Sequence, residues 1–413
     1  MVKVCIIGAG RAGVEAAAEA ARRGAQVTLL ERSDCLLPHR SAWPSFVASP
    51  SSMSSPGPPD SLASVDVAYS RPAIAVRPAS VVTPDGEVRF DKVVVATGSR
   101  QVFRTFPGFT KEGVIALDSL ARFVELGRQR SSLRKIVVCG ESPTGLRVAD
   151  ALSGDGTQVT LLCPGGKMLN DLHPDLDVKV RLSARRKGVR MVDEPIFRAF
   201  GHRAVEAVLA GGVVIPCDAI AVAPHEEPLI PQGCQPKGPH RGLSVGRELR
   251  SPVWGCYAAG GCAELIDGAL GGVSLKNSAK SSGRTAGANA AGSSLVFSPI
   301  GVFTGTFFGL RVSWAGLGFS EARSIGLHAR QISATGDEES GSSLVYDGDT
   351  GRVLGIQTVE KSSEDRSSLL PLLISQRVSI RALAFKDLGG STDISLLSEA
   401  ARQGLSEEAR ASA

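Results

Sequence analysis

Three glycines near the amino terminus stand at a spacing that cradles phosphates. Gly8, Gly10 and Gly13 follow an apolar run at residues 4–7 in the pattern G-x-G-x-x-G. Gly8 permits a tight turn out of a strand, Gly10 lets the backbone approach a pyrophosphate, and Gly13 lets the following helix pack on the sheet. The amide groups that open this helix then face the phosphates. We expect Ala12 to contribute to the same phosphate-binding turn.

An acidic residue completes this pattern. Glu31 ends a second predicted strand at residues 27–30, after an alanine-rich stretch that favours a helix. Its carboxylate can accept hydrogen bonds from a ribose, and its charge disfavours a 2′-phosphate there. Because the glycines lie between a strand and a helix, with an acid about 20 residues further on, the pattern favours dinucleotide binding over an incidental glycine-rich turn.

The composition is that of an ordinary globular protein. The chain has 413 residues, which predicts two or three domains, and a net charge of +5 without a basic cluster interleaved with aromatic residues, which argues against nucleic acid. The eight cysteines stand singly, so we expect a reducing, cytoplasmic compartment and no metal site. No signal peptide is expected, and the uncharged stretch 285–310 contains Asn289 and Pro299, which favours a helix end and a strand over a membrane span.

Two further segments carry a resemblance to a known family. Ala96-Thr97-Gly98 follows a predicted buried strand, and residues 257–264 read Tyr-Ala-Ala-Gly-Gly-Cys-Ala-Glu. With the first glycine motif, they make the chain similar to the two-dinucleotide-domain flavoproteins, the pyridine nucleotide-disulfide oxidoreductases, in the branch of coenzyme A-disulfide reductase and NADH oxidase. The resemblance implies an α/β fold with two Rossmann-like domains, which bind FAD and NADH or NADPH, and a C-terminal α+β dimerisation domain of a homodimer. It assigns Thr97, Gly98, Gly260 and Gly261 to FAD.

The same resemblance sets the domain boundaries. We expect an FAD-binding domain at residues 1–112 and 241–297, an NAD(P)-binding domain at 113–240, and the dimerisation domain at 298–413. Within these domains the sequence patterns predict further elements. They are a mobile Ser- and Pro-rich loop at 49–64, a three-stranded excursion at 204–209, 213–216 and 218–223, a helix at 274–291 and a strand at 302–310.

A second glycine motif opens the expected NAD(P)-binding domain. Gly140 and Gly145 match the first and third glycines, whereas Ser142 replaces the second. Ser142 can serve as a helix N-cap with Pro143 as the first helical residue, but its side chain crowds the place that a pyrophosphate must approach. Cys163 stands where NADH-using relatives carry an acid, and Lys167 follows nearby. NADPH is therefore as plausible as NADH, and a nucleotide domain that has lost its ligand remains an alternative.

The second flavin segment also departs from the family. Relatives place an aspartate after its first glycine, where the carboxylate binds the ribityl chain of FAD, but this chain has Gly261. The lost charge-assisted hydrogen bond corresponds to roughly 1.5–3 kcal/mol if nothing replaces it.

Cys35 is the candidate catalytic residue. Cys35-Leu-Leu-Pro-His resembles the stretch around the single redox cysteine of coenzyme A-disulfide reductases, and His39 or Arg40 nearby can lower the pKa of its thiol. Glu31 and Cys35 are closer in sequence than in those relatives, and residues 386–395 lack the tyrosines that they carry. A competing alignment on Pro38, Arg40 and Pro44 resembles ferredoxin reductases, in which this loop packs on the flavin without a redox cysteine.

The resemblance predicts an FAD-dependent NAD(P)H oxidoreductase that reduces a small disulfide, a persulfide or a similar sulfur acceptor through Cys35. Two alternatives stay open. One is an NAD(P)H oxidase or ferredoxin reductase-like flavoprotein without a redox cysteine. The other is a non-catalytic scaffold of the same fold, which the altered second glycine motif and Gly261 favour.

Overall fold

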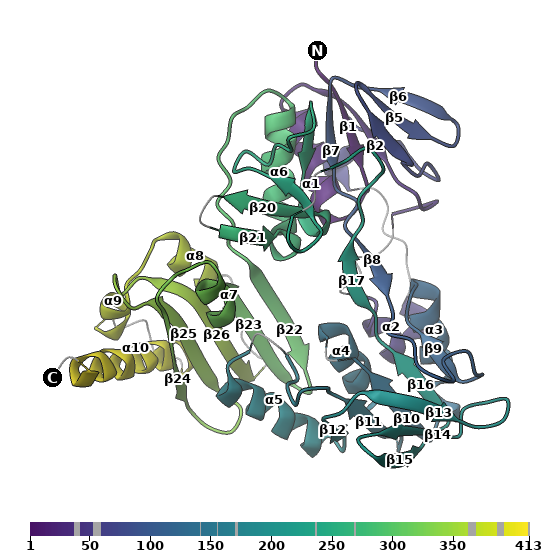
Figure 1. Cartoon of the computed structure of the whole chain (residues 1–413), viewed down its shortest axis with the longest axis vertical. Coiled ribbons are helices and arrows are strands. Elements are labelled where there is room, and N and C mark those ends of the chain that lie inside the picture. Colours follow the sequence, from purple (N-terminus) through teal and green to yellow (C-terminus); the bar gives the residue numbers. More distant parts are fainter. Residues whose placement is uncertain are drawn as a thin grey trace. The chain divides into compact units, whose positions relative to one another are not determined.

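The structure is a computed structural model of the chain. It describes residues 1–36, 42–52, 59–140, 142–154, 156–169, 172–235, 238–267, 270–361, 369–385 and 392–411. The chain divides into two compact units (Figure 1). The first unit comprises residues 1–39, 54–101 and 226–301, and the second comprises residues 40–53, 102–225 and 302–413. Each unit contains a five-stranded parallel sheet.

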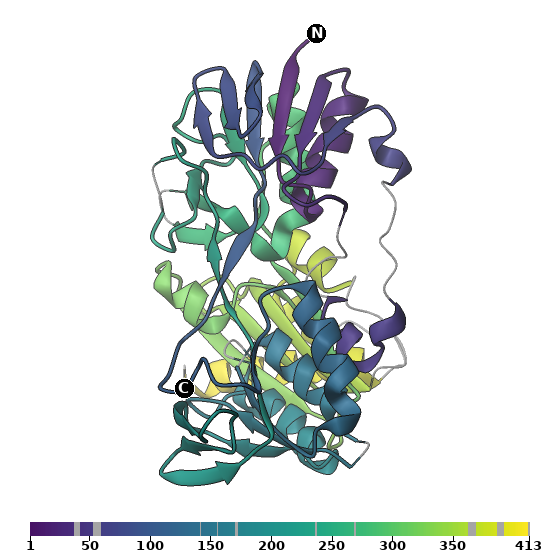
Figure 2. The ribbon, with the colours of Figure 1, turned by 90° about the vertical axis from the view of Figure 1, so that its right-hand side faces the viewer.

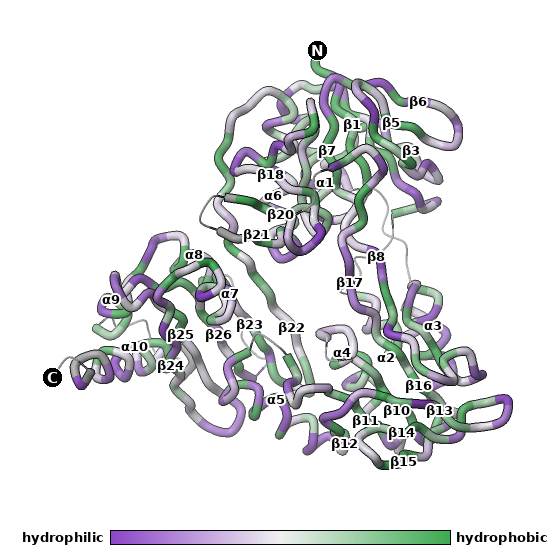
Figure 3. The backbone as a smooth tube through the Cα atoms, in the orientation of Figure 1, coloured by the Kyte–Doolittle hydropathy of each residue, from purple (hydrophilic) through white to green (hydrophobic). Residues whose placement is uncertain are grey.

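Strand β1 (Lys3–Ile7) lies at the centre of the first parallel sheet, whose order is β19-β7-β1-β2-β3. It pairs with β2 (Gln26–Leu30) on one side and with β7 (Lys92–Val95) on the other. Figure 3 shows hydrophobic residues along β1 and β7. A strand covered on both faces has no reason to alternate polar and apolar residues, which explains these continuous apolar runs. The outer strands are β3 (Asp66–Ala68) and β19 (Cys256–Ala258).

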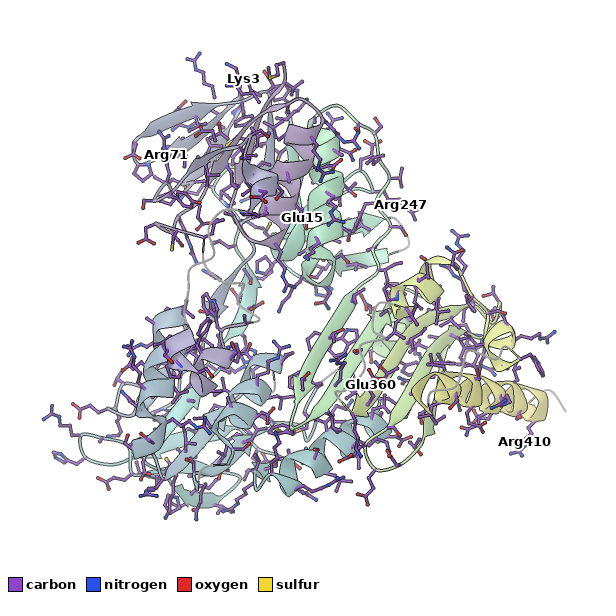
Figure 4. All side chains as sticks on the ribbon, turned by 180° about the vertical axis from the view of Figure 1, so that it is seen from behind. Lys3, Glu15, Arg71, Arg247, Glu360 and Arg410 are labelled. Atoms are coloured by element: carbon purple, nitrogen blue, oxygen red, sulfur yellow. The ribbon has the colours of Figure 1, made fainter. Side chains whose placement is uncertain are left out.

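Two glycine- and alanine-rich helices pack closely beside this sheet. Helix α1 (Arg11–Arg22) lies next to α6 (Ala279–Ala290) (Figure 2). A Cβ at Gly283 or Gly287 would overlap with the backbone of α1, so the two helices meet backbone to backbone. Figure 4 labels Glu15 on α1, whose carboxylate pairs with Arg284 of α6 at 2.7 Å. The helix expected at residues 274–291 starts only at Ala279, because Ser274 still belongs to a strand.

Smaller elements complete the first unit. An antiparallel hairpin sheet has the order β4-β5-β6, and another three-stranded sheet has the order β18-β20-β21. Strands β8 and β17 form a two-stranded ribbon. The bounds are β4 (Ala75–Arg77), β5 (Ser80–Thr83), β6 (Gly86–Arg89), β8 (Ser99–Val102), β17 (His225–Pro228), β18 (Leu243–Val245), β20 (Ala263–Asp267) and β21 (Leu270–Ser274), with single helical turns at Asp60–Leu62, Gly260–Cys262 and Lys276–Ser278.

The parallel sheet of the second unit has the order β12-β11-β10-β16-β9. The three-stranded excursion was predicted in part wrongly, because β16 (Ala219–Val222) pairs in parallel with β10 and is buried along its whole length. The excursion instead consists of β13 (Ile196–Phe200), β14 (Ala207–Ala210) and β15 (Val213–Pro216). The other elements are β9 (Val114–Ala116), α3 (Leu120–Gln129), β10 (Lys135–Cys139), α4 (Pro143–Leu152), β11 (Gln158–Leu162), α5 (Pro174–Arg186) and β12 (Arg190–Val192).

An antiparallel sheet of order β22-β23-β26-β25-β24 follows in the same unit. The single strand expected at 302–310 is wrong: Phe308 adopts a positive φ of 53° and turns the chain into a hairpin. The elements are β22 (Val302–Phe307), β23 (Leu310–Gly316), α7 (Phe319–Ser324), β24 (Ala329–Thr335), β25 (Gly341–Asp347), β26 (Val353–Lys361), α8 (Leu369–Ser375), α9 (Ile380–Ala384) and α10 (Thr392–Ala411).

Part of the expected mobile loop at 49–64 packs on helices. The helical turn at Pro50–Ser52 contacts α3, the turn at Asp60–Leu62 contacts α1, and Leu62 is buried in the first unit. Helix α2 (Ser45–Ala48), just before the loop, also packs against α3. Residues 53–58, which hold most of the Ser-Pro run, lie outside the described residues. In the part of the chain that is described, no helix is both long and apolar enough to cross a membrane.

Candidate functional site

The first glycine motif forms a turn that only glycine can make. Gly8 has a φ of 99°, and a Cβ there would lie 2.7 Å from the carbonyl oxygen of Ala96 on the neighbouring strand. A Cβ at Gly13 would overlap with the carbonyl oxygen of Gly8. The sequence thus fixes how closely α1 approaches β1, as the spacing predicts.

The start of α1 is open. Gly10 is its N-cap residue, no side chain caps the helix, and nothing lies within 4 Å of the place where a Cβ of Gly10 would stand. Ala12 is 5% exposed and lies under Gly260, whose Cβ would be 2.8 Å from that of Ala12. An uncapped helix start with room beside it is suited to an anionic group.

The carboxylate of Glu31 is held at the edge of this turn. Its Oε2 accepts a hydrogen bond of 2.8 Å from the backbone N–H of Ala9, and its Oε1 accepts one of 2.9 Å from that of Ser33. The acid therefore lies directly beside the glycine loop, although 22 residues separate Ala9 from Glu31. In this position a carboxylate can accept hydrogen bonds from the hydroxyl groups of a ribose.

The two later flavin segments reach the same turn. The backbone of Thr97 lies against Gly8, and a Cβ at Gly261 would have Gly98 as its nearest neighbour at 3.8 Å. The hydroxyl of Thr97 donates to the carbonyl oxygen of Leu229, and Gly98 accepts a 3.0 Å bond from Leu229 N–H. Thr97 therefore holds the segment at Leu229 in place, while Gly98 and Gly261 place no side chains on the surface beside the turn.

These residues fit a bound FAD. The structure gathers Gly8, Gly10, Gly13, Gly98 and Gly261 around one uncapped helix start, with a fixed carboxylate beside it. The ribityl-binding aspartate of the family is absent, and a Cβ added at Gly261 would make only ordinary van der Waals contacts, at 3.8 Å or more. FAD would be held by the α1 amides at its pyrophosphate and by Glu31 at its ribose.

The second glycine motif repeats this construction with one change. Gly140 has a φ of 142°, and a Cβ at Gly145 would overlap with the Gly140 carbonyl oxygen. Ser142, however, accepts a 3.2 Å hydrogen bond from Gly145 N–H through its hydroxyl. The Ser142 side chain thus accepts a hydrogen bond from an amide N–H, whereas no side chain caps the start of α1. This cap stabilises the start of α4 and leaves one fewer free amide N–H to bind a phosphate.

The other expected site residues are spread over both units. Cys163 is fully buried, with its thiol 3.8 Å from the sulfur of Met168, whereas Lys167 is exposed on the loop after β11. Cys35 is half-buried in a bend after β2. Arg40 lies outside the described residues.

Sequence reasoning missed the residues that support the first motif from α6. Ser282 accepts a 3.1 Å hydrogen bond from Gly260 N–H, and Gly283 and Gly287 bring α6 onto α1. The four-residue spacing of these two glycines within an alanine-rich helix was the available signal, because it places both on one helix face.

Comparison with known proteins decides the family. The family model described as pyridine nucleotide-disulphide oxidoreductase matches residues 2–287. The chain belongs to this family. Its members are FAD-dependent oxidoreductases of NAD(P)H. The mixed α/β fold with two Rossmann-like parallel sheets, expected from the sequence, is confirmed.

Individual relatives are more distant. The chain is 24% identical over 188 residues to the nitric oxide reductase FlRd-NAD(+) reductase of Aliivibrio fischeri, a match that covers 44% of this chain and 49% of the relative. The chain thus matches about half the length of this curated relative.

Two solved structures share the fold over nearly the whole chain. An NAD-dependent persulfide reductase from A. fulgidus superposes with a TM-score of 0.83 at 22% identity, over 98% of this chain and 83% of that one. A water-forming NADH oxidase from Lactobacillus brevis superposes with a TM-score of 0.85 at 19% identity, over 100% of both chains. At these identities the likeness shows the fold alone.

Proposed function

We propose that this protein oxidises NAD(P)H and reduces a small disulfide or persulfide through Cys35. The observation that supports a sulfur-containing acceptor is the difference in exposure among the cysteines. All eight are free, seven are buried, and only Cys35 is partly accessible. Burial raises the pKa of the thiols of Cys5, Cys139 and Cys217 to about 12, which keeps them protonated and inert at neutral pH.

The residues of the first unit would orient the cofactor. Gly10 and the amides of α1 would hold the pyrophosphate, and Glu31 would accept the ribose hydroxyls. When bound, FAD supplies the chemistry that takes a hydride from a nicotinamide and releases electrons in pairs. The bare backbone at Gly98 and Gly261 would let the cofactor lie close to the sheet edge.

Cys35 would act as the nucleophile toward the acceptor. Its thiolate attacks one sulfur of the disulfide, the S–S bond breaks, and the other sulfur leaves as a thiolate, so that Cys35 holds a mixed disulfide. Two electrons and one proton then restore the Cys35 thiolate and release the second product as a thiol. Only a reachable cysteine can perform this exchange, which is the reason for assigning it to Cys35.

A second candidate function does not use the cysteine. Ser33 N–H is bonded to the Glu31 carboxylate, so the chain is tied to the ribose-binding acid only two residues before Cys35. Four residues span at most about 14 Å, which keeps Cys35 near that acid. A cysteine held near the ribose would not contact the flavin ring, from which the electrons leave. This placement of Cys35 therefore favours electron transfer from the flavin to oxygen or to a protein carrier.

The substitution Cys35→Ser separates the two functions. We expect it to abolish NAD(P)H-dependent reduction of coenzyme A disulfide while anaerobic bleaching of the flavin by NAD(P)H persists. Cys139→Ala, at a buried cysteine, is the matched control and should retain disulfide reduction. Disulfide reduction at the wild-type rate in Cys35→Ser would refute the sulfur mechanism and leave the second candidate.

We also propose that the chain has the three domains expected from its sequence and that it forms a homodimer. The antiparallel sheet β22–β26 with α7 is the part of the chain expected to form the two-fold interface. Light scattering of the intact protein tests the assembly, and a mass of one chain of 42.9 kDa would contradict it.

A further inference from the structure

Two buried cysteines of the first unit contact each other. The thiol of Cys256, on β19, donates a hydrogen bond to the sulfur of Cys234. Cys234 is 1% exposed, and Cys256 is fully buried. The Cys256 sulfur also lies 3.6 Å from the carbonyl oxygen of Tyr257, which is a weaker acceptor than a thiolate. The reaction proposed for Cys35 uses neither thiol, so it leaves this pair without a function.

The fold itself brings the two thiols together. The chain before Cys234 is bound to the sheet β4-β5-β6, since the N–H of Val76 donates a hydrogen bond of 2.8 Å to the carbonyl oxygen of Gln232. Cys256 is paired with Val93 in the parallel register of β19 and β7. Backbone hydrogen bonds thus hold each segment in place independently of the contact between the thiols.

This contact makes the two thiols chemically unequal. The hydrogen bond from Cys256 lowers the pKa of the Cys234 thiol from its ordinary value, although burial acts in the opposite direction. The same hydrogen bond raises the pKa of Cys256, and burial raises it further. Because the thiolate is the form of cysteine that attacks an oxidant, Cys234 is the nucleophile of the pair. By contrast, burial raises the pKa of Cys5, in the same unit, to about 12.

We propose that Cys234 and Cys256 are a dithiol that hydrogen peroxide oxidises to an intramolecular disulfide bond. The Cys234 thiolate attacks one oxygen of the peroxide, the O–O bond breaks, and hydroxide leaves and takes up a proton to become water. Cys234 is then a sulfenic acid. The Cys256 sulfur bonds to the Cys234 sulfur, and the sulfenic hydroxyl leaves as water with the proton of Cys256. The two thiols lose two electrons in total, and one peroxide is reduced to two water molecules.

The size of the oxidant matters because both thiols are buried. Hydrogen peroxide is little larger than water, so a brief local opening of the segment at Gln232 admits it. A bulky disulfide needs a far larger opening. This difference separates the buried pair from Cys35, which is partly accessible in the folded protein.

The new bond would link two segments that reach the flavin turn. Leu229, on the same segment as Cys234, accepts a hydrogen bond from the hydroxyl of Thr97. Strand β19, which carries Cys256, leads into the helical turn Gly260–Cys262. Oxidation would therefore join the chain that holds Thr97 to the strand that leads to the second flavin segment.

Counting free thiols tests this pair. The intact chain carrying Cys35→Ser, which removes the accessible thiol, is treated with hydrogen peroxide and then with catalase. It is unfolded, alkylated with N-ethylmaleimide and weighed by mass spectrometry. Seven of the eight cysteines remain in this variant. We expect five alkylated thiols after peroxide, and seven when the oxidised protein is reduced with dithiothreitol before alkylation.

Further variants of this Cys35→Ser protein identify the two partners. Cys234→Ala and Cys256→Ala should each keep all six of their thiols after peroxide. Cys5→Ala, at another buried cysteine of the same unit, is the matched control and should lose two of its six. Seven alkylated thiols in the peroxide-treated Cys35→Ser protein would overturn the proposal, and so would the loss of two thiols in Cys234→Ala. These results do not depend on the sulfur chemistry proposed for Cys35, because that residue is replaced throughout.

Discussion

The carbonyl oxygen of Gly8 stands where a side chain on Gly13 would have to go. The carbonyl oxygen is a backbone atom, and the backbone also fixes the position of an added Cβ, so neither can rotate away. Gly13→Ala would push α1 off β1, and we expect it to reduce the free energy of unfolding by about 3 kcal/mol or more. Chemical denaturation monitored by circular dichroism measures this. Unchanged stability in Gly13→Ala would contradict the close packing described.

Gly10→Ala separates binding from folding at the same turn. Nothing lies within 4 Å of the added methyl group, and the backbone φ of −72° suits alanine, so stability should change by less than about 1 kcal/mol. The methyl group would nevertheless stand where a pyrophosphate approaches. We expect weaker FAD binding by equilibrium dialysis, and wild-type affinity would argue against this phosphate position.

Ser142→Gly tests whether the hydroxyl obstructs the second motif. It frees the Gly145 N–H and costs only a few tenths of a kcal/mol as a helix cap. We expect NAD(P)⁺ to bind several-fold more tightly in calorimetric titrations. Ser142→Thr keeps the hydroxyl and serves as the control. Weaker binding in Ser142→Gly would mean that the hydroxyl helps to hold the ligand.

Gly261→Asp should restore the carboxylate that relatives carry. The nearest neighbour of the added Cβ would be Gly98 at 3.8 Å, an ordinary van der Waals contact. One charge-assisted hydrogen bond predicts at least about tenfold tighter FAD binding. Gly246→Asp, in open space in the same unit, is the control for added charge. No gain over this control would show that the ribityl chain lies elsewhere.

The sequence predicted the first nucleotide fold well because strand, glycine spacing and helix all act locally. The sequence also predicted Ser142 as a helix N-cap before Pro143, and this is confirmed, because the Ser142 hydroxyl accepts a hydrogen bond from Gly145 N–H. Residues 219–222 were assigned to the wrong sheet because a short apolar strand fits either, and pairing with β10 decides. The hairpin at Phe308 was missed because a phenylalanine rarely adopts a positive φ.

His173 predicts a pH dependence of stability. Its Nδ1 caps α5 by accepting a hydrogen bond of 3.2 Å from Asp175 N–H, and burial holds its pKa below the usual 6.5. Because the folded state binds the proton less readily than the unfolded state, stability is fully present above pH 6.5. It falls as the pH drops through the folded-state pKa, by about 1 kcal/mol for the lost cap.

Thermal unfolding of the wild type and of His173→Asn between pH 7.5 and pH 5 measures this effect. Asparagine also caps a helix but does not titrate, so the variant should lose less stability on acidification. An identical pH dependence in the two proteins would rule out His173 as the source.

The flavin content of the purified protein shows most directly whether the glycine turn of the first unit holds FAD. The protein is isolated, incubated with excess FAD, desalted, and its visible absorbance and FAD stoichiometry are measured beside Gly10→Ala. We expect a yellow protein with one FAD per chain that NAD(P)H bleaches anaerobically, and less FAD in the variant. A folded but colourless wild type after this treatment would contradict it.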